Sequence, residues 1–522
     1  MKSREEDREL CNTQIVVILI LAVMMFGCAS SRITYPDAPF DAKANDLVLK
    51  AGTFETESNK YNADFGTLVV PENRNKVDAR LIKLPVIRIH ASGNKPAEPI
   101  FRLTGGPGLS NMKWRPSDSL LSNHDVVLVG YRGVDGSSVL DCPEVEKALK
   151  GEGGDLLGEK TLRNIAEAWT DCASRLTKEG IDIDGYTMME VIEDMESART
   201  ALGYERIDLY SVSYGTRVAY LYALKHPDRI YRSVMIGVNP PGHMVWEPGR
   251  IDAQLQYYAD LWARDSVMSA CTPDLLATMR NVAHNMPRRW LFFNINPGKV
   301  RTTTFLLLYH RNTSALVFDA YVAAEKGDPS GLALMSMAYN FTAPSAMTWG
   351  DLLSKGVSAD FDSSRDYFTE MDPPDAIIGS PMGKLLWGPV RFGFWPVKPI
   401  PEEFRKLQPS DVQTLLISGS IDFASPAEAA TKELLPYLTR GKQVILSEMG
   451  HIDDVWSVRP EATQRLMTSF FNTGVPDTSL CSYVPMDFNV GWSFQKIAKV
   501  GLGIAVGGVA IIVGGLAWLL LR

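Results

Sequence analysis

The stretch Leu209–Gly215 constrains the fold of this 522-residue chain more than any other. Residues 205–210 alternate like a short strand, and residues 216–225 have a helical pattern that stops before Pro227. A strand that turns at once into a helix, with a serine such as Ser213 at the turn, is typical of a nucleophile elbow. The turn lifts the serine hydroxyl clear of the sheet and aims a helix N-terminus at it.

The elbow departs from the usual G-x-S-x-G pattern at one position. Ser211 stands where the first glycine is expected, whereas Gly215 keeps the second. Both positions require small residues because the turn is tight, and serine meets that requirement. A serine at a strand-to-helix turn is also a common N-cap, so the function of Ser213 depends on what accompanies it.

Strand and helix patterns alternate on both sides of the elbow. This rhythm predicts an α/β fold with a mostly parallel central sheet and helices on both faces. The rhythm breaks from residue 242 to residue 400, a stretch rich in Trp, Met, Tyr and Phe, which we interpret as a helical lid over the site. Strands are expected at 65–71, 81–90, 100–103, 125–129, 232–237, 412–418 and 443–446, and a closing helix at 460–472.

A nucleophilic serine needs a base that takes its proton and an acid that orients the base. In this topology the chain order is serine, acid, histidine, and the histidine follows the last strand. Of the seven histidines in the chain, only His451 lies there. Asp422 follows the strand at 412–418, at the carboxyl end where sites in such sheets lie. We therefore expect Ser213, Asp422 and His451 to form a catalytic triad.

Each triad residue has an ordinary structural alternative. Asp422 could be a turn aspartate before Pro426, and His451 could be a loop histidine. Asp453 and Asp454 follow the histidine closely and are fallback candidates for the acid. Only the order of the three residue types at three strand ends favours catalysis.

The sequence Gly105-Gly106-Pro107-Gly108 follows an inner strand. Glycines at such a position let the backbone approach a ligand and point an N–H at it. We expect the amides of Tyr214 and Gly106 to form an oxyanion hole, with Gly105 as the second choice. The alternative is an ordinary glycine–proline turn.

Five motifs together resemble α/β-hydrolases of the prolyl aminopeptidase and tripeptidyl aminopeptidase group of serine peptidases. The resemblance covers roughly residues 60–485 and is least specific in the lid. The motifs are Gly105-Gly-Pro-Gly108, Tyr131-Arg-Gly-Val-Asp-Gly-Ser-Ser138, Ser213-Tyr-Gly-Thr-Arg217, Ser418-Gly-Ser-Ile-Asp-Phe-Ala-Ser-Pro426 and Gly450-His451.

The resemblance implies an exo-acting serine peptidase with the α/β-hydrolase fold. Such enzymes hold the free amino group of a peptide with acidic lid residues and release one or a few N-terminal residues. Glu247 is a weak candidate for this role, and a solvated surface glutamate is the alternative. The chemistry needs neither a metal nor an organic cofactor, and the Arg-Gly segment at 132–133 is interpreted as a structural turn rather than a phosphate cradle.

Three departures from the family pattern leave the specificity open. They are Ser211, Thr104 where prolyl aminopeptidases carry histidine, and Gly136-Ser-Ser in the Arg-Gly segment. A membrane-associated carboxylesterase or lipase uses the same triad, so motifs do not exclude it. A surface binding protein with a retired hydrolase domain is the alternative of another class.

Each end of the chain contains a long apolar run. Ile15–Phe26 is an apolar run of 12 residues, the length of a signal-peptide core, and Cys28 follows it among small residues. This pattern predicts a lipoprotein-like signal peptide at 1–28 with Cys28 as the lipid attachment site, and an uncleaved anchor is the alternative. The 22 uncharged residues Val500–Leu521 predict a C-terminal transmembrane helix.

Four cysteines remain between these ends: Cys142, Cys172, Cys271 and Cys481. An even number in an exported domain suggests two disulfides, and four cysteines allow three pairings. Cys142 with Cys172 is the most local pairing and the preferred one, which leaves Cys271 with Cys481; buried free thiols are the alternative. The family's cysteine pair is matched in position by Cys142 and Cys172.

These patterns divide the chain and limit its partners. The net charge of −8 gives no reason to expect nucleic acid. We expect peptide substrates with a free N-terminus, contact with a membrane, and an exported, membrane-anchored location in a bacterial cell envelope. The expected divisions are a signal peptide at 1–28, a tether at 29–50, a hydrolase core at 51–241 and 401–485, the lid at 242–400 and the transmembrane helix at 500–521.

Overall fold

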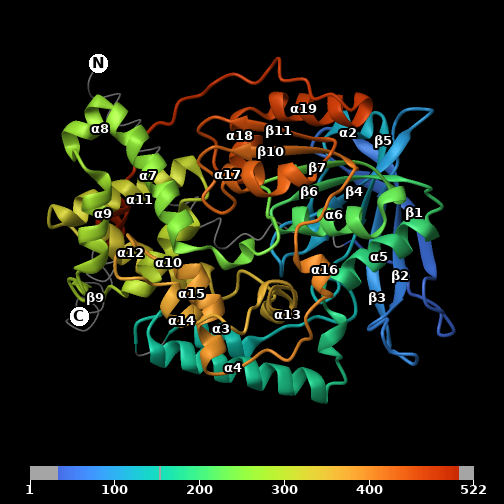
Figure 1. Cartoon of the computed structure of the whole chain (residues 1–522), viewed down its shortest axis with the longest axis horizontal. Coiled ribbons are helices and arrows are strands. Elements are labelled where there is room, and N and C mark those ends of the chain that lie inside the picture. Colours follow the sequence, from blue (N-terminus) through green and yellow to red (C-terminus); the bar gives the residue numbers. More distant parts are fainter. Residues whose placement is uncertain (1–32, 152–153, 505–522) are drawn as a thin grey trace, which may run out of the picture.

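A computed structural model describes residues 33–151 and 154–504. A large twisted sheet forms one side of the molecule, and helices of the lid, residues 242–400, form the other side (Figure 1). The expected sites at Cys28 and in most of the run 500–521 lie outside the described residues. Within 33–151 and 154–504, no helix is both long enough and apolar enough to cross a membrane.

The sheet has the order β1-β2-β3-β5-β4-β6-β7-β10-β11 in the described chain. Its first three strands and β5 pair in antiparallel fashion, and the strands from β5 to β11 pair in parallel. The predicted α/β class, with a mostly parallel sheet, is confirmed. The strands are β1 (Leu47–Glu55), β2 (Lys60–Pro71), β3 (Leu81–Ile89), β4 (Ala97–Leu103), β5 (His124–Val129), β6 (Ile207–Val212), β7 (Ile230–Ile236), β10 (Gln413–Gly419) and β11 (Gly441–Leu446).

Helices cover both faces of the sheet, and the apolar residues of β4, β5, β6 and β10 are buried between them. The alternating strand–helix pattern positions these helices, because each parallel connection must cross a face of the sheet. The helices outside the lid are α2 (Asp118–Leu121), α3 (Pro143–Leu149), α4 (Glu159–Lys178), α5 (Met188–Ala201), α6 (Tyr214–Lys225), α16 (Glu402–Arg405), α17 (Ala427–Ala429), α18 (Ile452–Val458) and α19 (Pro460–Thr473). Of these, α3 and α4 pack against each other beside the lid rather than on the sheet (Figure 1).

The lid consists mainly of helices and carries one short hairpin, β8 (Arg289–Trp290) and β9 (Phe293–Asn294). Its helical patterns at 251–261 and 314–324 lie inside longer helices, as the sequence predicts. The lid helices are α7 (Pro248–Arg264), α8 (Ser266–Cys271), α9 (Leu275–His284), α10 (Pro297–Leu307), α11 (Arg311–Glu325), α12 (Ser330–Thr342), α13 (Trp349–Asp360), α14 (Tyr367–Glu370) and α15 (Pro381–Trp387).

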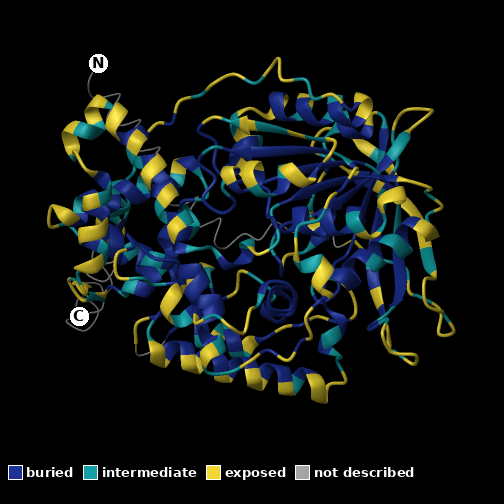
Figure 2. Ribbon diagram, in the orientation of Figure 1, coloured by how far each residue is buried: buried dark blue, intermediate teal, exposed yellow. Residues whose placement is uncertain are grey.

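One lid helix lies in the interior. Every residue of α13 is buried, and Figure 2 shows this helix as an entirely dark-blue coil near the centre of the molecule. Its polar residues therefore need partners inside the protein. A solvent-covering lid helix would instead carry one exposed face.

The edge strand β1 was not predicted from the sequence. It begins at Leu47, inside the segment 29–50 that we expected to be a tether. The strand pairs with β2 along its whole length, from Leu47 opposite Leu68 to Glu55 opposite Lys60. Most of its side chains are exposed, so the sequence lacks the apolar alternation that identifies half-buried strands.

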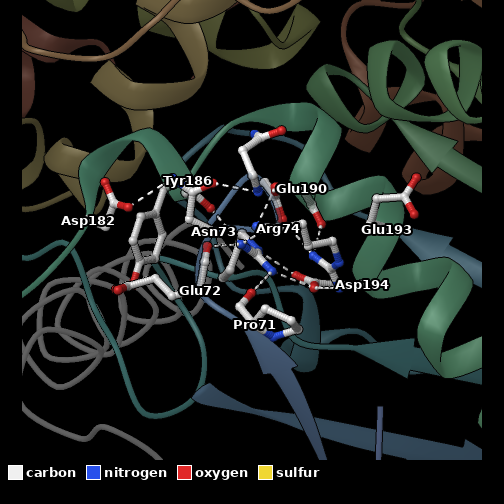
Figure 3. A network of polar contacts seen from close by, with 12 residues as sticks. Pro71, Glu72, Asn73, Arg74, Asp182, Tyr186, Glu190, Glu193 and Asp194 are labelled. Carbon is white, nitrogen blue, oxygen red and sulfur yellow. Dashed lines mark hydrogen bonds and ion pairs between the residues drawn. The ribbon is translucent and has the colours of Figure 1, made fainter. Parts of the chain in front are cut away.

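Arg132 of the Arg-Gly segment is fully buried and ties the loop after β5 to α5. Its Nε and Nη2 atoms each donate to the Asp194 carboxylate at 2.6 Å, and Nη1 donates to the carbonyl oxygens of Glu72 and Gly185 at 2.6 Å. Figure 3 shows Asp194 and Glu190 facing Arg74, which donates to both carboxylates. The arginine fulfils a structural role in this network.

The cysteines pair only in part as expected. Cys142 and Cys172 form a disulfide between the start of α3 and the middle of α4, with a Cα–Cα distance of 5.6 Å. Cys271 and Cys481 are both free thiols, so the expected second disulfide is wrong for this structure. Cys271 is exposed at the end of α8 in the lid, whereas Cys481 lines a hollow beside β11 with Met449 and Val455.

Replacing both Cys142 and Cys172 by alanine is expected to lower the free energy of unfolding by about 3–4 kcal/mol, because the disulfide closes a loop in the unfolded chain. Urea unfolding under oxidising and reducing conditions measures the difference. Cys271→Ser is the matched control and is expected to leave stability unchanged, since that exposed thiol forms no disulfide and a serine hydroxyl can also accept the hydrogen bond from Lys326. A wild-type midpoint that does not fall when the disulfide is reduced contradicts the prediction.

Candidate active site

Ser213 occupies the turn between β6 and α6 with φ +49° and ψ −126°. A positive φ is strained for a residue other than glycine, and such strain is typical of functional sites. A glycine is required at Gly215, two residues further on, because a Cβ there would lie 2.3 Å from the carbonyl oxygen of Leu103. The Ser213 side chain is partly exposed, although the residues on either side of it are buried.

The serine at position 211 is accommodated by a hydrogen bond. Its side chain is fully buried, and Oγ donates to the carbonyl oxygen of Val234 in the neighbouring strand β7 at 3.1 Å. A buried hydroxyl with such a partner costs little. The departure from G-x-S-x-G is therefore compatible with a normally formed elbow.

Asp422 and His451 are in direct contact after β10 and β11. The distance between His451 Nδ1 and Asp422 Oδ2 is 2.8 Å, and both side chains are buried. Asp422 Oδ1 also accepts the backbone N–H groups of Ala424 and Ser425, which fixes the carboxylate. The carboxylate can therefore orient the imidazole and stabilise it when it is protonated.

His451 and Ser213 lie at the same edge of the sheet, on either side of Gly237. The Ser213 N–H donates to the Ile236 carbonyl at 2.9 Å, and a Cβ on Gly237 would lie 2.8 Å from His451 Cε1. In the described part of the structure, Ser213 Oγ and His451 are not hydrogen-bonded to each other. Catalytic hydrogen bonds are often loose without substrate, so the arrangement fits a triad before substrate binding.

The two fallback acids have other contacts. Asp454 Oδ2 accepts the N–H groups of Gly450 and Arg311 at 2.9 and 2.8 Å, and thereby joins the histidine loop to the lid. The Asp453 side chain is mostly exposed. Neither carboxylate contacts the His451 ring in the described chain, so Asp422 is the acid that the geometry supports.

The lid contacts the histidine directly through Tyr309, which follows α10. The carbonyl oxygen of Tyr309 accepts the His451 N–H at 2.6 Å, and the two rings pack edge to face with their centres 5.2 Å apart. The next residue, His310, has Nδ1 3.7 Å from Asp454 Oδ1 and Nε2 3.7 Å from Asp453 Oδ2. A movement of the lid at Tyr309 would therefore also move the His451 ring.

The glycine-rich loop after β4 approaches Ser213 closely. A Cβ on Gly105 would lie 3.1 Å from Ser213 Cβ, and Gly106 has a φ of +116°, in the region that favours glycine. Tyr214 opens α6, so its N–H has no partner within that helix. The amides chosen from the sequence as oxyanion donors thus belong to segments that flank the serine.

Two residues that sequence reasoning missed hold this loop in place. Asp351 of α13 accepts the Gly108 N–H at 3.0 Å, and Lys355 donates to Asp351 at 2.5 Å and to the Arg132 carbonyl at 3.2 Å. Both side chains are fully buried. Burial raises the pKa of the Asp351 carboxyl and lowers the pKa of the Lys355 ammonium.

The far end of α13 contacts the elbow helix. Arg217, in the first turns of α6, donates to Asp360 at 2.7 Å, and both side chains are buried. Asp360 also accepts the N–H groups of Gly242 and Met244, where the lid begins. One buried helix therefore braces the glycine-rich loop at one end and the elbow at the other.

The weak candidate for amine binding, Glu247, is engaged elsewhere. Both of its carboxylate oxygens accept from Arg365, at 2.7 and 3.1 Å. Glu433 lines the same hollow of about 190 Å³ and is paired with His243 and Arg250. The described residues of this hollow, which also include Phe423 and Ala424 beside Asp422, thus offer no unpaired carboxylate to an amine.

The contact between His310 of the lid and the carboxylates of Asp453 and Asp454 is expected to stabilise the protein in a pH-dependent way. The neighbouring Asp454 raises the pKa of His310 above its usual 6.5, and Asp453 and Asp422 act in the same direction. A raised pKa means that the stabilisation is complete below about pH 6.5 and is lost as pH rises through the folded-state pKa. In urea unfolding between about pH 6 and pH 8, we expect His310→Gln to lose more stability at the lower pH.

The control for this prediction is His284→Gln, because His284 contacts a backbone carbonyl rather than a carboxylate. Its stability loss should be the same at both pH values. If His310→Gln loses the same unfolding free energy at both pH values, Asp454 does not raise the pKa of His310 as predicted.

Comparisons with known proteins agree with this fold. A family model described as the alpha/beta hydrolase fold matches residues 98–315. A tripeptidyl aminopeptidase of Streptomyces coelicolor is 24% identical over 209 residues, which is 37% of this chain and 38% of that protein. The putative hydrolase YuaR of Escherichia coli is 27% identical over 237 residues, 43% of this chain and 44% of that protein.

The matched segments thus span about two fifths of each of these curated relatives. A crystal structure of a serine hydrolase from Cycloclasticus zankles aligns with 82% of this chain and all of that chain, at 14% identity and a TM-score of 0.34. The strand order, the family model and the sequence relatives place the chain in one fold family. The chain therefore has the α/β-hydrolase fold, and part of its sequence is similar to tripeptidyl aminopeptidases.

Proposed function

We propose that the chain is a serine aminopeptidase that releases one or a few residues from the free N-terminus of a peptide. The observation that carries the proposal is the buried contact between His451 and Asp422 at the edge of the sheet where the Ser213 elbow lies. The similarity to tripeptidyl aminopeptidases supports a peptide substrate.

In the proposed mechanism His451 Nε2 removes the proton of Ser213 Oγ as this oxygen attacks the carbonyl carbon of the scissile amide. Asp422 holds the Nδ1–H tautomer and stabilises the imidazolium. The amides of Tyr214 and Gly106 stabilise the oxyanion, each by about 3 kcal/mol. His451 then protonates the leaving amine, and a water activated by the same histidine hydrolyses the acyl-enzyme.

The proposal includes export and attachment to a membrane of the bacterial cell envelope. Residues 494–504 are helical, and they lead into the uncharged run Val500–Leu521. Lipidation of Cys28 would supply a second anchor. Mass spectrometry of the mature N-terminus tests the lipid: an intact Met1, or a cleavage elsewhere than before Cys28, rejects it.

Activity is tested on the full chain in detergent with fluorogenic amides of Pro, Ala and Ala-Ala-Pro, their N-acetylated forms and a p-nitrophenyl ester. Cleavage of the free-amine substrates that is lost on acetylation supports the aminopeptidase. Ester cleavage alone shifts the function to a carboxylesterase or lipase with the same triad. No turnover, combined with no labelling of Ser213 by a fluorophosphonate, indicates a retired binding protein.

A further inference from the structure

An apolar tip protrudes from the lid at the β8–β9 hairpin. Leu291 and Phe292 connect the two strands, and they are 63% and 71% exposed. Trp290 and Phe293 stack behind them with ring centres 5.6 Å apart. Exposure of large apolar side chains to water is unfavourable, so their position at the end of a hairpin indicates that they contact another surface.

The helix α12 extends this apolar surface. Both strands of the hairpin pack against it. Its side chains that are not buried include Leu334, Met337, Ala338 and Phe341, at the spacing of one helix face, and Phe341 is 80% exposed. A surface helix normally turns polar residues outward, whereas this stripe of α12 is apolar.

Cationic side chains surround the base of the hairpin. Lys150, Arg288 and Arg289 line a hollow of about 670 Å³ together with Asn340 of α12. None of these three cations forms an ion pair with a described residue. Among the described residues that line this hollow one is acidic, Asp155, and its carboxylate accepts the N–H of Gly298 at 2.8 Å.

The end of the described chain packs on the same part of the lid. Gln495 donates to Asp319 of α11 and lies against Gly331, in the first turn of α12. Lys499 donates to Asp328, just before α12. At about 1.5 Å per residue, Gly331 and Met337 are roughly 9 Å apart along α12. Lys499 contacts Asp328, so the uncharged run that begins at Val500 starts at the N-terminal end of α12, on which the apolar stripe also lies.

We infer that the tip Leu291–Phe292, the α12 stripe and the cations Arg288 and Arg289 form a surface that rests on an anionic lipid bilayer. Apolar and aromatic side chains enter the interface of a bilayer, and arginines beside them attract anionic headgroups. The inference rests on the proposed membrane attachment and adds that the lid faces the bilayer, while the central sheet points away from it.

The test uses the full chain reconstituted into phosphatidylcholine vesicles that contain phosphatidylglycerol. A fluorescent amino acid is incorporated in place of Phe292, Phe341 or Val77; Val77 is fully exposed in the loop between β2 and β3. Brominated acyl chains quench emission only from groups inside the bilayer. We expect quenching at positions 292 and 341 and none at position 77.

A chain that is held by the vesicles but shows no quenching at position 292 overturns the lid surface and leaves the anchor standing. A chain that the vesicles do not hold at all overturns both. Emission at position 292 that depends on protein concentration and not on bromination means that a second copy covers the surface, which also rejects the inference.

The charge contribution is tested with the double variant Arg288→Glu/Arg289→Glu. We expect it to lose quenching at position 341 in vesicles with phosphatidylglycerol. The matched control, Lys50→Glu/Lys83→Glu, changes two exposed lysines on the sheet and keeps the quenching. Equal quenching in both double variants rejects the role of the arginines.

Discussion

Ser213→Ala is expected to lower kcat by about 10³- to 10⁶-fold, because it removes the hydroxyl oxygen that forms the acyl-enzyme in the proposed mechanism. The remaining activity would come from the oxyanion donors and substrate binding. Stopped and continuous assays with the best free-amine substrate of the panel measure the loss. The alanine fits the elbow, since only a hydroxyl is deleted from a partly exposed side chain.

Ser211→Gly is the matched control for this variant. It removes a hydroxyl two residues away and restores the usual elbow pattern. The lost hydrogen bond to Val234 costs about 1 kcal/mol of stability, and the greater backbone freedom of glycine in a strand costs roughly 0.5–1 kcal/mol more. We expect this variant to retain kcat within a few-fold of the wild type. If Ser213→Ala keeps wild-type turnover, or if Ser211→Gly is as inactive as Ser213→Ala, the assignment of the nucleophile is wrong.

The residues at the strand ends of this site could be predicted from the sequence, because the patterns that identify them lie within a few consecutive residues. The elbow joins a strand pattern to a helix pattern within seven residues, and His451 is the only histidine after the last strand. The expected strands from 65–71 to 443–446 all lie within or overlap observed strands. The contact between His451 and Asp422 follows from topology, since neighbouring parallel strands end at the same edge.

The bracing helix could not be predicted in the same way. Asp351 and Lys355 have the i,i+4 spacing of an ordinary surface ion pair, and nothing in the local sequence shows that α13 is buried. Their partner Gly108 is 243 residues away, and Asp360 and its partner Arg217 are 143 residues apart. Such contacts depend on tertiary packing, which periodicity does not report.

The same reason explains the error at Cys271 and Cys481. Counting cysteines favours a second disulfide, but pairing requires that the two Cβ atoms face each other at close range. Cys271 lies at the end of an exposed lid helix, and Cys481 lies against the sheet side of the molecule. The pair Cys142–Cys172 forms because Cys142 directly precedes α3 and Cys172 lies in α4, and these two consecutive helices pack together.

The buried pair Asp351–Lys355 is expected to matter for stability and for catalysis in separable ways. Lys355→Met leaves the Asp351 carboxylate buried without its counter-ion, which should cost about 3–5 kcal/mol of unfolding free energy. Asp351→Asn/Lys355→Met removes both charges and keeps an oxygen that accepts the Gly108 N–H. We expect this double variant to regain most of the lost stability, because uncharged side chains of similar size need no counter-ion.

A second double variant, Asp351→Leu/Lys355→Met, removes the charges and also the acceptor for Gly108. We expect its kcat to fall by about 10- to 100-fold with little change in KM, since a loop misplaced by about 1 Å loses oxyanion stabilisation rather than ground-state binding. Asp351→Asn/Lys355→Met is its matched control and should keep kcat. Urea unfolding and steady-state kinetics on the same preparations separate the two effects. Equal kcat values for the two double variants would mean that Asp351 only stabilises the fold, and that the glycine-rich loop holds its position without the Gly108 hydrogen bond.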